Sequence, residues 1–169
     1  ILHKMMKESD NLYAESMYYQ IAASTGNRPA SAKSARNVER QLIRKIGLDP
    51  ARYKLADGSG LSLYNYLSAE LEVKLLRYAY RDENMYQQLK QSLPIAGVDG
   101  TLKKRMKTGY AHGNVKAKTG TLTGIISLAG YCKAANGHEL CFSIINNGIM
   151  HGNNARNFAD KVCELLCKP

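Results

Sequence analysis

The spacing of apolar residues changes about halfway along this sequence of 169 residues. In the first half, apolar residues recur every three or four positions, which is the period of a helix with one buried face. In the second half they gather in short runs bounded by glycine and asparagine, which is typical of β-strands. Because helices come first and the strands follow together, the sequence predicts an α+β layer structure with an antiparallel sheet.

Helices are expected throughout the first half, and capping residues mark several of their ends. Ser31 and Ser68 precede helical stretches, where a serine hydroxyl can accept a hydrogen bond from an unpaired backbone N–H group. Gly47 stands where a glycine commonly ends a helix. The expected helices cover residues 12–24, 31–46, 68–78 and about 84–93.

Strands are expected in the second half, followed by a helix that covers the sheet. The strands are placed at residues 114–119, 124–133 and 139–146. Between the last two, Asn136-Gly137 is a strong signal for a two-residue hairpin turn, because both residue types tolerate positive φ. The closing helix begins near residue 153 and is expected to bury the side chains of Phe158, Val162 and Leu166.

The cysteines are Cys132, Cys141, Cys163 and Cys167, and the first two fall on the expected hairpin. A two-residue turn places Cys132 opposite Cys141 at a pair without mutual hydrogen bonds, where Cα atoms approach to about 4.5 Å. That separation permits a disulfide. Two free, buried thiols that pack as small apolar groups are the alternative. Cys163 and Cys167 lie on the closing helix and are expected to stay unbonded.

Charge and composition exclude several classes of function. The formal net charge is +10 at pH 7, but the basic residues are spread along the chain without a nucleic-acid-binding motif, so no nucleic-acid partner is expected. The cysteines and histidines lack the spacing of metal ligands, and no metal site is expected. No apolar run approaches the ~20 residues of a membrane span, and no signal peptide is present.

Two tripeptides carry groups that suit acyl-transfer chemistry. They are Ser9-Asp10-Asn11 and Lys118-Thr119-Gly120. Taken singly, the first is also what a helix cap looks like, and the second could simply end a strand. Together and in this order, they match the second and third elements of the motif set of serine penicillin-binding enzymes and β-lactamases.

Four blocks of sequence extend this match. They are residues 9–15 (SDNLYAE), 57–62 (DGSGLS), 93–97 (LPIAG) and 116–121 (KAKTGT). By these blocks the sequence resembles the penicillin-binding serine D-alanyl-D-alanine carboxypeptidase/endopeptidase family. The resemblance implies a penicillin-binding transpeptidase/β-lactamase-like fold, an antiparallel sheet flanked by helices. It also implies that residues 1–169 are the C-terminal portion of a single catalytic domain, incomplete at its N-terminal side.

The chemistry of the two tripeptides agrees with this resemblance, and three residues are expected to be catalytic. Lys118 can direct positive charge toward the terminal carboxylate of a peptide and lower the pKa of a neighbouring hydroxyl. Ser9 can relay a proton to the leaving amine. Asn11 can hydrogen-bond the peptide backbone through both ends of its amide group.

The remaining site residues are expected to bind or border the substrate. Thr119 and Thr121 offer hydroxyl groups to a carboxylate, and Gly120 leaves room for the substrate to approach. The resemblance implies that the backbone N–H of Thr121 is half of the oxyanion hole, the donor pair that stabilises the tetrahedral intermediate. Asp57 and Ser59, in a loop with two glycines, are expected to organise the border of the site.

The motif set lacks its first element, because no serine in the sequence has a lysine three positions later. The family carries its nucleophile in such an S-x-x-K element, so the resemblance implies a nucleophile upstream and no turnover by this chain alone. The implied parent is a periplasmic or cell-envelope hydrolase of peptidoglycan stem peptides that needs no cofactor and that β-lactam antibiotics acylate, with its targeting signal upstream.

Two alternatives remain beside this interpretation. A non-catalytic peptidoglycan-binding or scaffold module belongs to a different class, and the presence of S-x-x-K upstream would discriminate against it. A serine β-lactamase shares the two tripeptides but fits less well. Its class A form adds an E-x-x-L-N element, which the sequence approaches only at residues 39–43 (ERQLI), in the middle of an expected helix.

One position departs from the family pattern. After the block at 57–62 the family commonly has an arginine, which can hold a substrate carboxylate through two hydrogen bonds. This sequence has Leu63 there. Either another basic residue reaches the same place, for which Lys103, Lys104 and Arg105 are candidates by charge, or the enzyme is less selective for stem peptides with a side-chain carboxylate.

Overall fold

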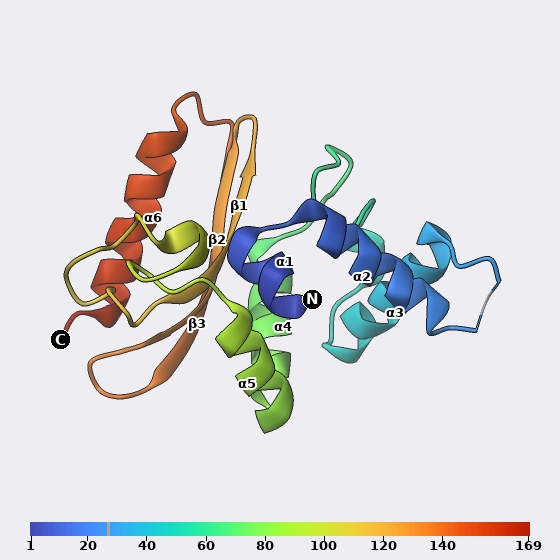
Figure 1. Ribbon diagram of the computed structural model, residues 1–169, viewed down its shortest axis with the longest axis horizontal. Helices are drawn as coiled ribbons and strands as arrows, with labels where there is room; N and C mark the ends of the chain where they lie inside the picture. The colour runs from blue at the N-terminus through green and yellow to red at the C-terminus, as the bar shows by residue number, and fades with distance from the viewer. Residues whose placement is uncertain (27) are drawn as a thin grey trace.

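The computed structural model describes residues 1–26 and 28–169, and it is layered around a central sheet (Figure 1). The C-terminal helix α6 (Gly152–Cys167) covers one face of the sheet, and α4 (Ala69–Tyr80) lies against the other face. Helices α2 (Asn11–Ala23) and α3 (Ala32–Lys45) pack on each other at the side of the molecule away from α6. The predicted α+β class is confirmed.

The helices begin at the capping residues that the sequence indicated. The hydroxyls of Ser31 and Ser68 accept hydrogen bonds from the backbone N–H groups of Ser34 and Leu71. The remaining helical elements are α1 (Leu2–Glu8), α5 (Glu83–Ser92) and the short 3-10 helices η1 (Pro50–Arg52) and η2 (Gly100–Leu102). Over residues 1–26 and 28–169, no helix is long and apolar enough to cross a membrane.

The sheet consists of antiparallel strands in the order β1-β2-β3. The strands are β1 (Lys116–Leu122), β2 (Ile125–Lys133) and β3 (Glu139–Asn147). β1 begins later than predicted because the side chain of Asn114 replaces a backbone pair. Its amide nitrogen donates to the carbonyl of Lys133, and its oxygen accepts from the N–H of Lys133, both at 2.8 Å.

The hairpin between β2 and β3 has a three-residue loop in place of the predicted two-residue turn. The N–H of Ala134 donates to the carbonyl of His138, and the N–H of Gly137 donates to the carbonyl of Ala134, both at 2.9 Å. Gly137 has a φ of 84°, in the left-handed region. This is the geometry of a turn closed by a left-handed glycine, and it includes Ala135 in the loop.

The extra loop residue shifts the strand register by one, so the predicted pairing of Cys132 with Cys141 is wrong. Cys132 pairs with Leu140, and Cys141 pairs with Tyr131. A shift of one residue turns a side chain to the opposite face of the sheet. Cys132 accordingly packs in the core under α6, whereas Cys141 packs against the cluster that contains Tyr131. All four cysteines are free, which confirms the expectation for the two in α6 and excludes the 132–141 bridge in this structure.

Helix α6 packs on the sheet through small residues, and this corrects the predicted buried face. The residues of α6 that are buried recur every four positions: Ala155, Ala159, Cys163 and Cys167. The side chain of Phe158, predicted to be buried, is 54% exposed, while Leu166 packs at the edge of this core and Val162 is half-buried. Small side chains let a helix lie close to a sheet, so Ala155 and Ala159 are buried against it while the larger Phe158 is not.

Candidate active site

Ser9 lies in the turn between α1 and α2, and it has a left-handed backbone with φ 56° and ψ 47°. The next residue, Asp10, caps α2, because its carboxylate accepts the backbone N–H of Tyr13 at 3.1 Å. Asn11 is the first residue of α2 and is exposed. The tripeptide therefore caps a helix, which is the purely structural role that its sequence also allowed. It also presents the Ser9 hydroxyl at the surface of a cavity.

Helix α1 is anchored beside β1, and this anchor sets the position of Ser9. The Lys7 ammonium donates to the carboxylate of Asp99 at 2.6 Å. Asp99 in turn accepts the backbone N–H of Ile95, at 2.8 Å, next to the start of β1. At Gly100 a Cβ atom would lie 2.5 Å from the carbonyl oxygen of Lys7, so only glycine allows the two segments to approach this closely.

Lys118 on β1 meets Ser9 across 109 residues of sequence. Its Nζ donates to Ser9 Oγ and to the carbonyl oxygen of Thr119, both at 2.6 Å. Burial lowers the pKa of the Lys118 ammonium to about 8, because the charged form loses solvation. The lysine therefore remains mostly cationic at neutral pH, yet it gives up a proton more readily than an exposed lysine does.

The residues after Lys118 combine hydroxyl groups with an open strand surface. Thr119 Oγ1 donates to Thr101 Oγ1 at 2.9 Å, which ties β1 to η2. A Cβ atom at Gly120 would lie 2.3 Å from Ser127 Oγ, so a larger residue would collide with that hydroxyl. Thr121 is exposed.

The outer edge of β1 is partly paired and partly free. The N–H of Ala117 donates to the carbonyl of Pro94 at 3.0 Å, so this residue directs its backbone groups outward from the sheet. Backbone direction alternates along a strand, and the N–H groups of Thr119 and Thr121 therefore face the same outer edge. Over the described residues, no strand pairs with that part of β1. An extended peptide could add there as a further strand.

The loop at 57–62 is held together by the Asp57 carboxylate. It accepts the N–H groups of Gly60 and Ser62 at 2.8 and 2.7 Å and the side-chain amide of Asn65 at 2.9 Å. Glu15 on α2 accepts the N–H of Ser59 at 2.9 Å. The loop is thus fastened to the same helix that begins at Asn11.

These elements surround a cavity of about 590 Å³. Of the residues that the sequence predicted to be catalytic or to bind or border the substrate, those that line it are Ser9, Asn11, Ser59, Lys118, Thr119, Gly120 and Thr121. Asp57 does not line the cavity, and its carboxylate instead holds the loop together. The structure therefore brings together segments from both ends of the chain. The described residues contain no cluster of side chains that could hold a metal ion.

The amino-acid sequence matches the sequence model of the D-Ala-D-Ala carboxypeptidase 3 (S13) family over residues 1–168. The chain belongs to this family. It is 36% identical over 154 residues to a D-alanyl-D-alanine carboxypeptidase of Haemophilus influenzae, covering 90% of this chain and 32% of the relative. It is 40% identical over 153 residues to a D-alanyl-D-alanine carboxypeptidase of an Actinomadura strain, covering 88% of this chain and 28% of the relative.

Solved structures of S13 relatives agree with the fold. The crystal structure of penicillin-binding protein 4 from Haemophilus influenzae matches with a TM-score of 0.85 and 33% identity, covering 96% of this chain and 39% of that one. A second structure of the same Haemophilus protein contains a β-lactam. The chain thus spans about a third of the length of the curated S13 relatives it matches.

Three further residues lie at or beside this cavity and were not predicted from the sequence. Ser127 and Glu72 line the cavity from β2 and α4, and Thr101 holds Thr119. Glu72 accepts a hydrogen bond from Ser143 Oγ at 2.6 Å, and burial raises the pKa of its carboxyl group. Only pairing across the sheet and contact with α4 bring these residues to the site, and no local pattern in the sequence signals either.

Proposed function

We propose that the chain forms part of the active site of a serine D-Ala-D-Ala carboxypeptidase or endopeptidase. In this proposal, residues 1–169 are the C-terminal portion of one catalytic domain that acts on peptidoglycan stem peptides in the periplasm or cell envelope. The observation that carries the proposal is the 2.6 Å hydrogen bond from Lys118 Nζ to Ser9 Oγ at a cavity that Asn11 also lines. Membership of the S13 family supports it.

The proposed reaction passes through an acyl-serine. A serine oxygen attacks the carbonyl carbon before the last D-alanine, the C–N bond breaks, and the leaving amine gains a proton. Water then cleaves the ester and restores the serine. Because no S-x-x-K occurs in residues 1–169, we assign the nucleophile and its partner lysine to a part of the protein outside this chain.

In this scheme the hydrogen-bonded pair of Lys118 and Ser9 delivers the proton that the leaving amine gains. Ser9 Oγ passes a proton to the leaving amine and is replenished by the Lys118 ammonium, whose lowered pKa of about 8 makes that transfer less costly. Before this transfer, the positive charge of the Lys118 ammonium attracts the terminal carboxylate of the peptide. Asn11 and Ser59 line the same cavity and bind or border the peptide.

The free edge of β1 is proposed to hold the substrate. A peptide that extends along Thr119 and Thr121 gains backbone hydrogen bonds without the need for a particular side chain. The outward N–H of Thr121 then lies where a carbonyl oxygen can approach, and we assign it to half of the oxyanion hole. Gly120 keeps the strand narrow beside Ser127, which leaves the cavity open.

Covalent labelling by a fluorescent penicillin tests the proposal. In the longer protein, Lys118→Ala should reduce the acylation rate by about 10²-fold, as expected for loss of one electrostatic element in an acyl-transfer site. Lys116→Ala is the matched control, because it makes the same change on the same strand outside the cavity. It should label close to the wild-type rate.

The 169-residue chain by itself provides the second arm of the test. It should remain unlabelled on a denaturing gel, because it lacks the S-x-x-K serine. Stable labelling of this chain would overturn the assignment of the nucleophile. A loss of less than about threefold in folded Lys118→Ala protein would remove Lys118 from the acyl-transfer step. No labelling of the longer protein would favour a non-catalytic peptidoglycan-binding module.

A further inference from the structure

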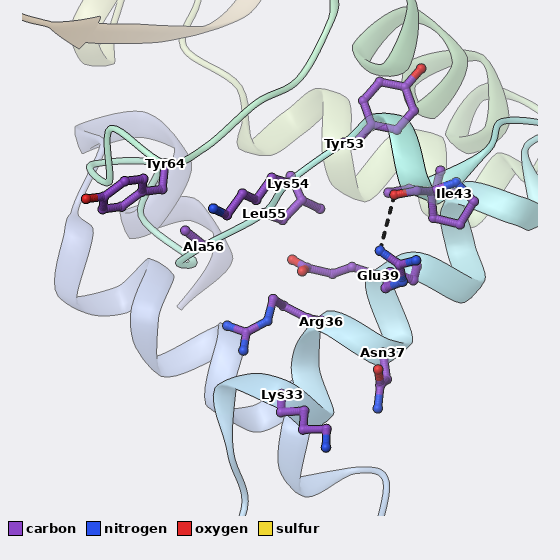
Figure 2. Close-up of a pocket in the computed structure, with 12 residues that line it drawn as sticks. Lys33, Arg36, Asn37, Glu39, Ile43, Tyr53, Lys54, Leu55, Ala56 and Tyr64 are labelled. Carbon is purple, nitrogen blue, oxygen red and sulfur yellow. Dashed lines mark hydrogen bonds between the residues drawn. The ribbon is translucent and has the colours of Figure 1, made fainter.

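A second cavity of about 530 Å³ lies on the helical side of the molecule, between α3 and the segment 50–56. It shares no lining residue with the cavity around Lys118. Figure 2 shows the side chain of Glu39 extending from α3 toward the space between Arg36 and Ala56. The cavity therefore has an acidic side chain in its wall.

The Glu39 carboxylate lacks a partner for one of its oxygens. Oε2 is buried and makes no hydrogen bond within the described part of the chain. Burial raises the pKa of Glu39 to about 7, while Arg36 has a smaller opposite effect. Buried polar atoms in folded proteins are almost always paired, so an unpaired acceptor on a side chain that lines a cavity calls for a donor, which a ligand seated against Glu39 supplies. Tyr53 also has an unpaired buried hydroxyl, but Figure 2 shows it directed away from Glu39.

Basic side chains surround this acceptor. The basic residues that line the cavity are Lys33, Arg36, Arg40 and Lys54, and Glu39 is the one acidic residue among the lining residues. Over residues 1–26 and 28–169, none of the four forms an ion pair within 4 Å. Arg40 is held by the carbonyl of Pro50 at 3.2 Å, and Lys54 Nζ lies 5.1 Å from the centre of the Tyr64 ring.

The two features together define the ligand chemistry. Glu39 requires an N–H donor, and the surrounding cations require an anion. A free ammonium would meet the repulsion of four positive side chains, so an uncharged amide N–H suits Glu39 better. The C-terminal residue of a peptide has both groups a few ångströms apart, and Ile43, Leu55 and Ala56 give the cavity an apolar wall for a small side chain.

We propose that this cavity is a second ligand site, which binds an N-acylated amino acid or peptide end. In this site the amide N–H of the terminal residue donates to Glu39, and its carboxylate binds Arg36 and Lys54. The site uses no residue of the Lys118 cavity, so the proposal holds or fails independently of the proposed enzymatic activity.

Amide chemical shifts of the 169-residue chain, titrated with N-acetyl-D-alanyl-D-alanine, test this site. Saturable shifts are expected at residues 36–40 and 53–56, and they should persist in Lys118→Ala protein. The analogue with a C-terminal carboxamide should bind at least about tenfold more weakly, because it lacks the charge that Arg36 and Lys54 attract. Free D-alanine, which carries an ammonium in place of the amide N–H, should also bind more weakly.

Two variants examine the assigned contacts. Arg36→Gln should raise the Kd about tenfold, the effect of losing a hydrogen bond to a charged group. Arg44→Gln is the matched control, because Arg44 is exposed on the same helix and does not line the cavity. Glu39→Gln keeps an acceptor of the same shape, so it should weaken binding less than Glu39→Leu does.

Three outcomes would overturn the proposal. They are shifts confined to residues 118–121, equal Kd values for the carboxylate and carboxamide peptides, and no saturable shift at about 10 mM peptide, where a millimolar site is largely filled. Equal Kd values for Arg36→Gln and Arg44→Gln would remove Arg36 from the site. A dispersed spectrum identical to the wild type outside the cavity shows that each variant is folded.

Discussion

The backbone of Ser9 adopts a left-handed conformation that residues other than glycine seldom take, and this costs of order 1–3 kcal/mol. The neighbouring contacts maintain it. Ser9 caps the C-terminal end of α1, the Asp10 carboxylate caps α2 one residue later, and the Lys118 ammonium donates to the serine hydroxyl. The local signal of a cap and the chemical signal of the motif thus describe the same residues.

At the scale of a single side chain, Leu63 is predicted to influence which stem peptide is preferred. It is 73% exposed and lines the cavity around Lys118. An aliphatic side chain cannot bind a carboxylate, so we expect Leu63→Arg in the longer protein to raise kcat/KM for a peptide with a side-chain carboxylate relative to a lysine-type peptide. The gain should be about 1–2 kcal/mol, since the contact is partly exposed.

Leu61→Arg is the control for this prediction. Leu61 lines the same cavity and is 51% exposed. The Leu61→Arg substitution therefore introduces the same charge two residues away on the same loop. Paired kinetics on the two peptides distinguish a specific contact from a general change in potential. An unchanged ratio of the two rates in Leu63→Arg protein would show that position 63 does not select the substrate.

At the scale of elements, the length of the β2–β3 loop determines the face of the sheet on which Cys132 and Cys141 each lie. The loop of Ala135, Asn136 and Gly137 contains one residue more than the minimal turn. This residue moves Cys132 and Cys141 to opposite faces of the sheet. Burial also raises the pKa of the Cys132 and Cys163 thiols to about 12, which suppresses the reactive thiolate.

Thiol counting tests this register. Alkylation of denatured, non-reduced protein should modify all four cysteines, as measured by mass spectrometry. A parallel sample that is reduced before alkylation gives the reference mass. Two unmodified cysteines in the non-reduced sample, identified by peptide mapping as Cys132 and Cys141, would contradict the register described here.

At the scale of the whole molecule, the candidate active site lies where the helical side and the sheet side meet. Ser9 and the loop at 57–62 come from the helical side, and Lys118 comes from the edge of the sheet (Figure 1). The ion pair of Lys7 with Asp99 and the hydrogen bond of Ser143 with Glu72 connect these two sides. Loosening either connection is therefore expected to move the site residues apart.

Glu39 makes the stability of the whole molecule depend on pH. Its pKa is raised from 4.5 to about 7 in the folded chain, so the folded state binds more protons between these values. Its contribution to stability is fully present below pH 4.5 and is lost as the pH rises through 7. We expect Glu39→Gln to stabilise the chain by about 1–2 kcal/mol at pH 8 and to change little at pH 4.5.

Urea unfolding at the two pH values measures this difference. Glu70→Gln is the control, because Glu70 is an exposed carboxylate on α4, paired with Lys74 only at 3.7 Å. It should change the free energy of unfolding by a similar, small amount at both pH values. Equal effects of Glu39→Gln at pH 4.5 and pH 8 would show that the carboxyl group is solvated in the folded chain.

Features that depend on neighbouring residues could be predicted from the amino-acid sequence. Ser31 and Ser68 mark helix starts because a cap involves N–H groups only three residues away. The change of apolar period located the helices and the sheet, since each period reflects one buried face. The motifs at 9–11 and 118–120 indicated the polar residues at the centre of the prediction, Ser9, Asn11, Lys118 and Thr119, which all line the cavity, because their chemistry is a property of the side chains themselves.

Features that depend on distant residues, or on a shift of one residue in strand register, could not be predicted in this way. One loop residue reversed the faces of Cys132 and Cys141, and a close fit on the sheet buried Ala159 in preference to Phe158. The orphan oxygen of Glu39 arises only when α3 packs beside residues 50–56. Periodicity and capping extend over a few residues, whereas these features arise from packing between segments that the chain keeps far apart.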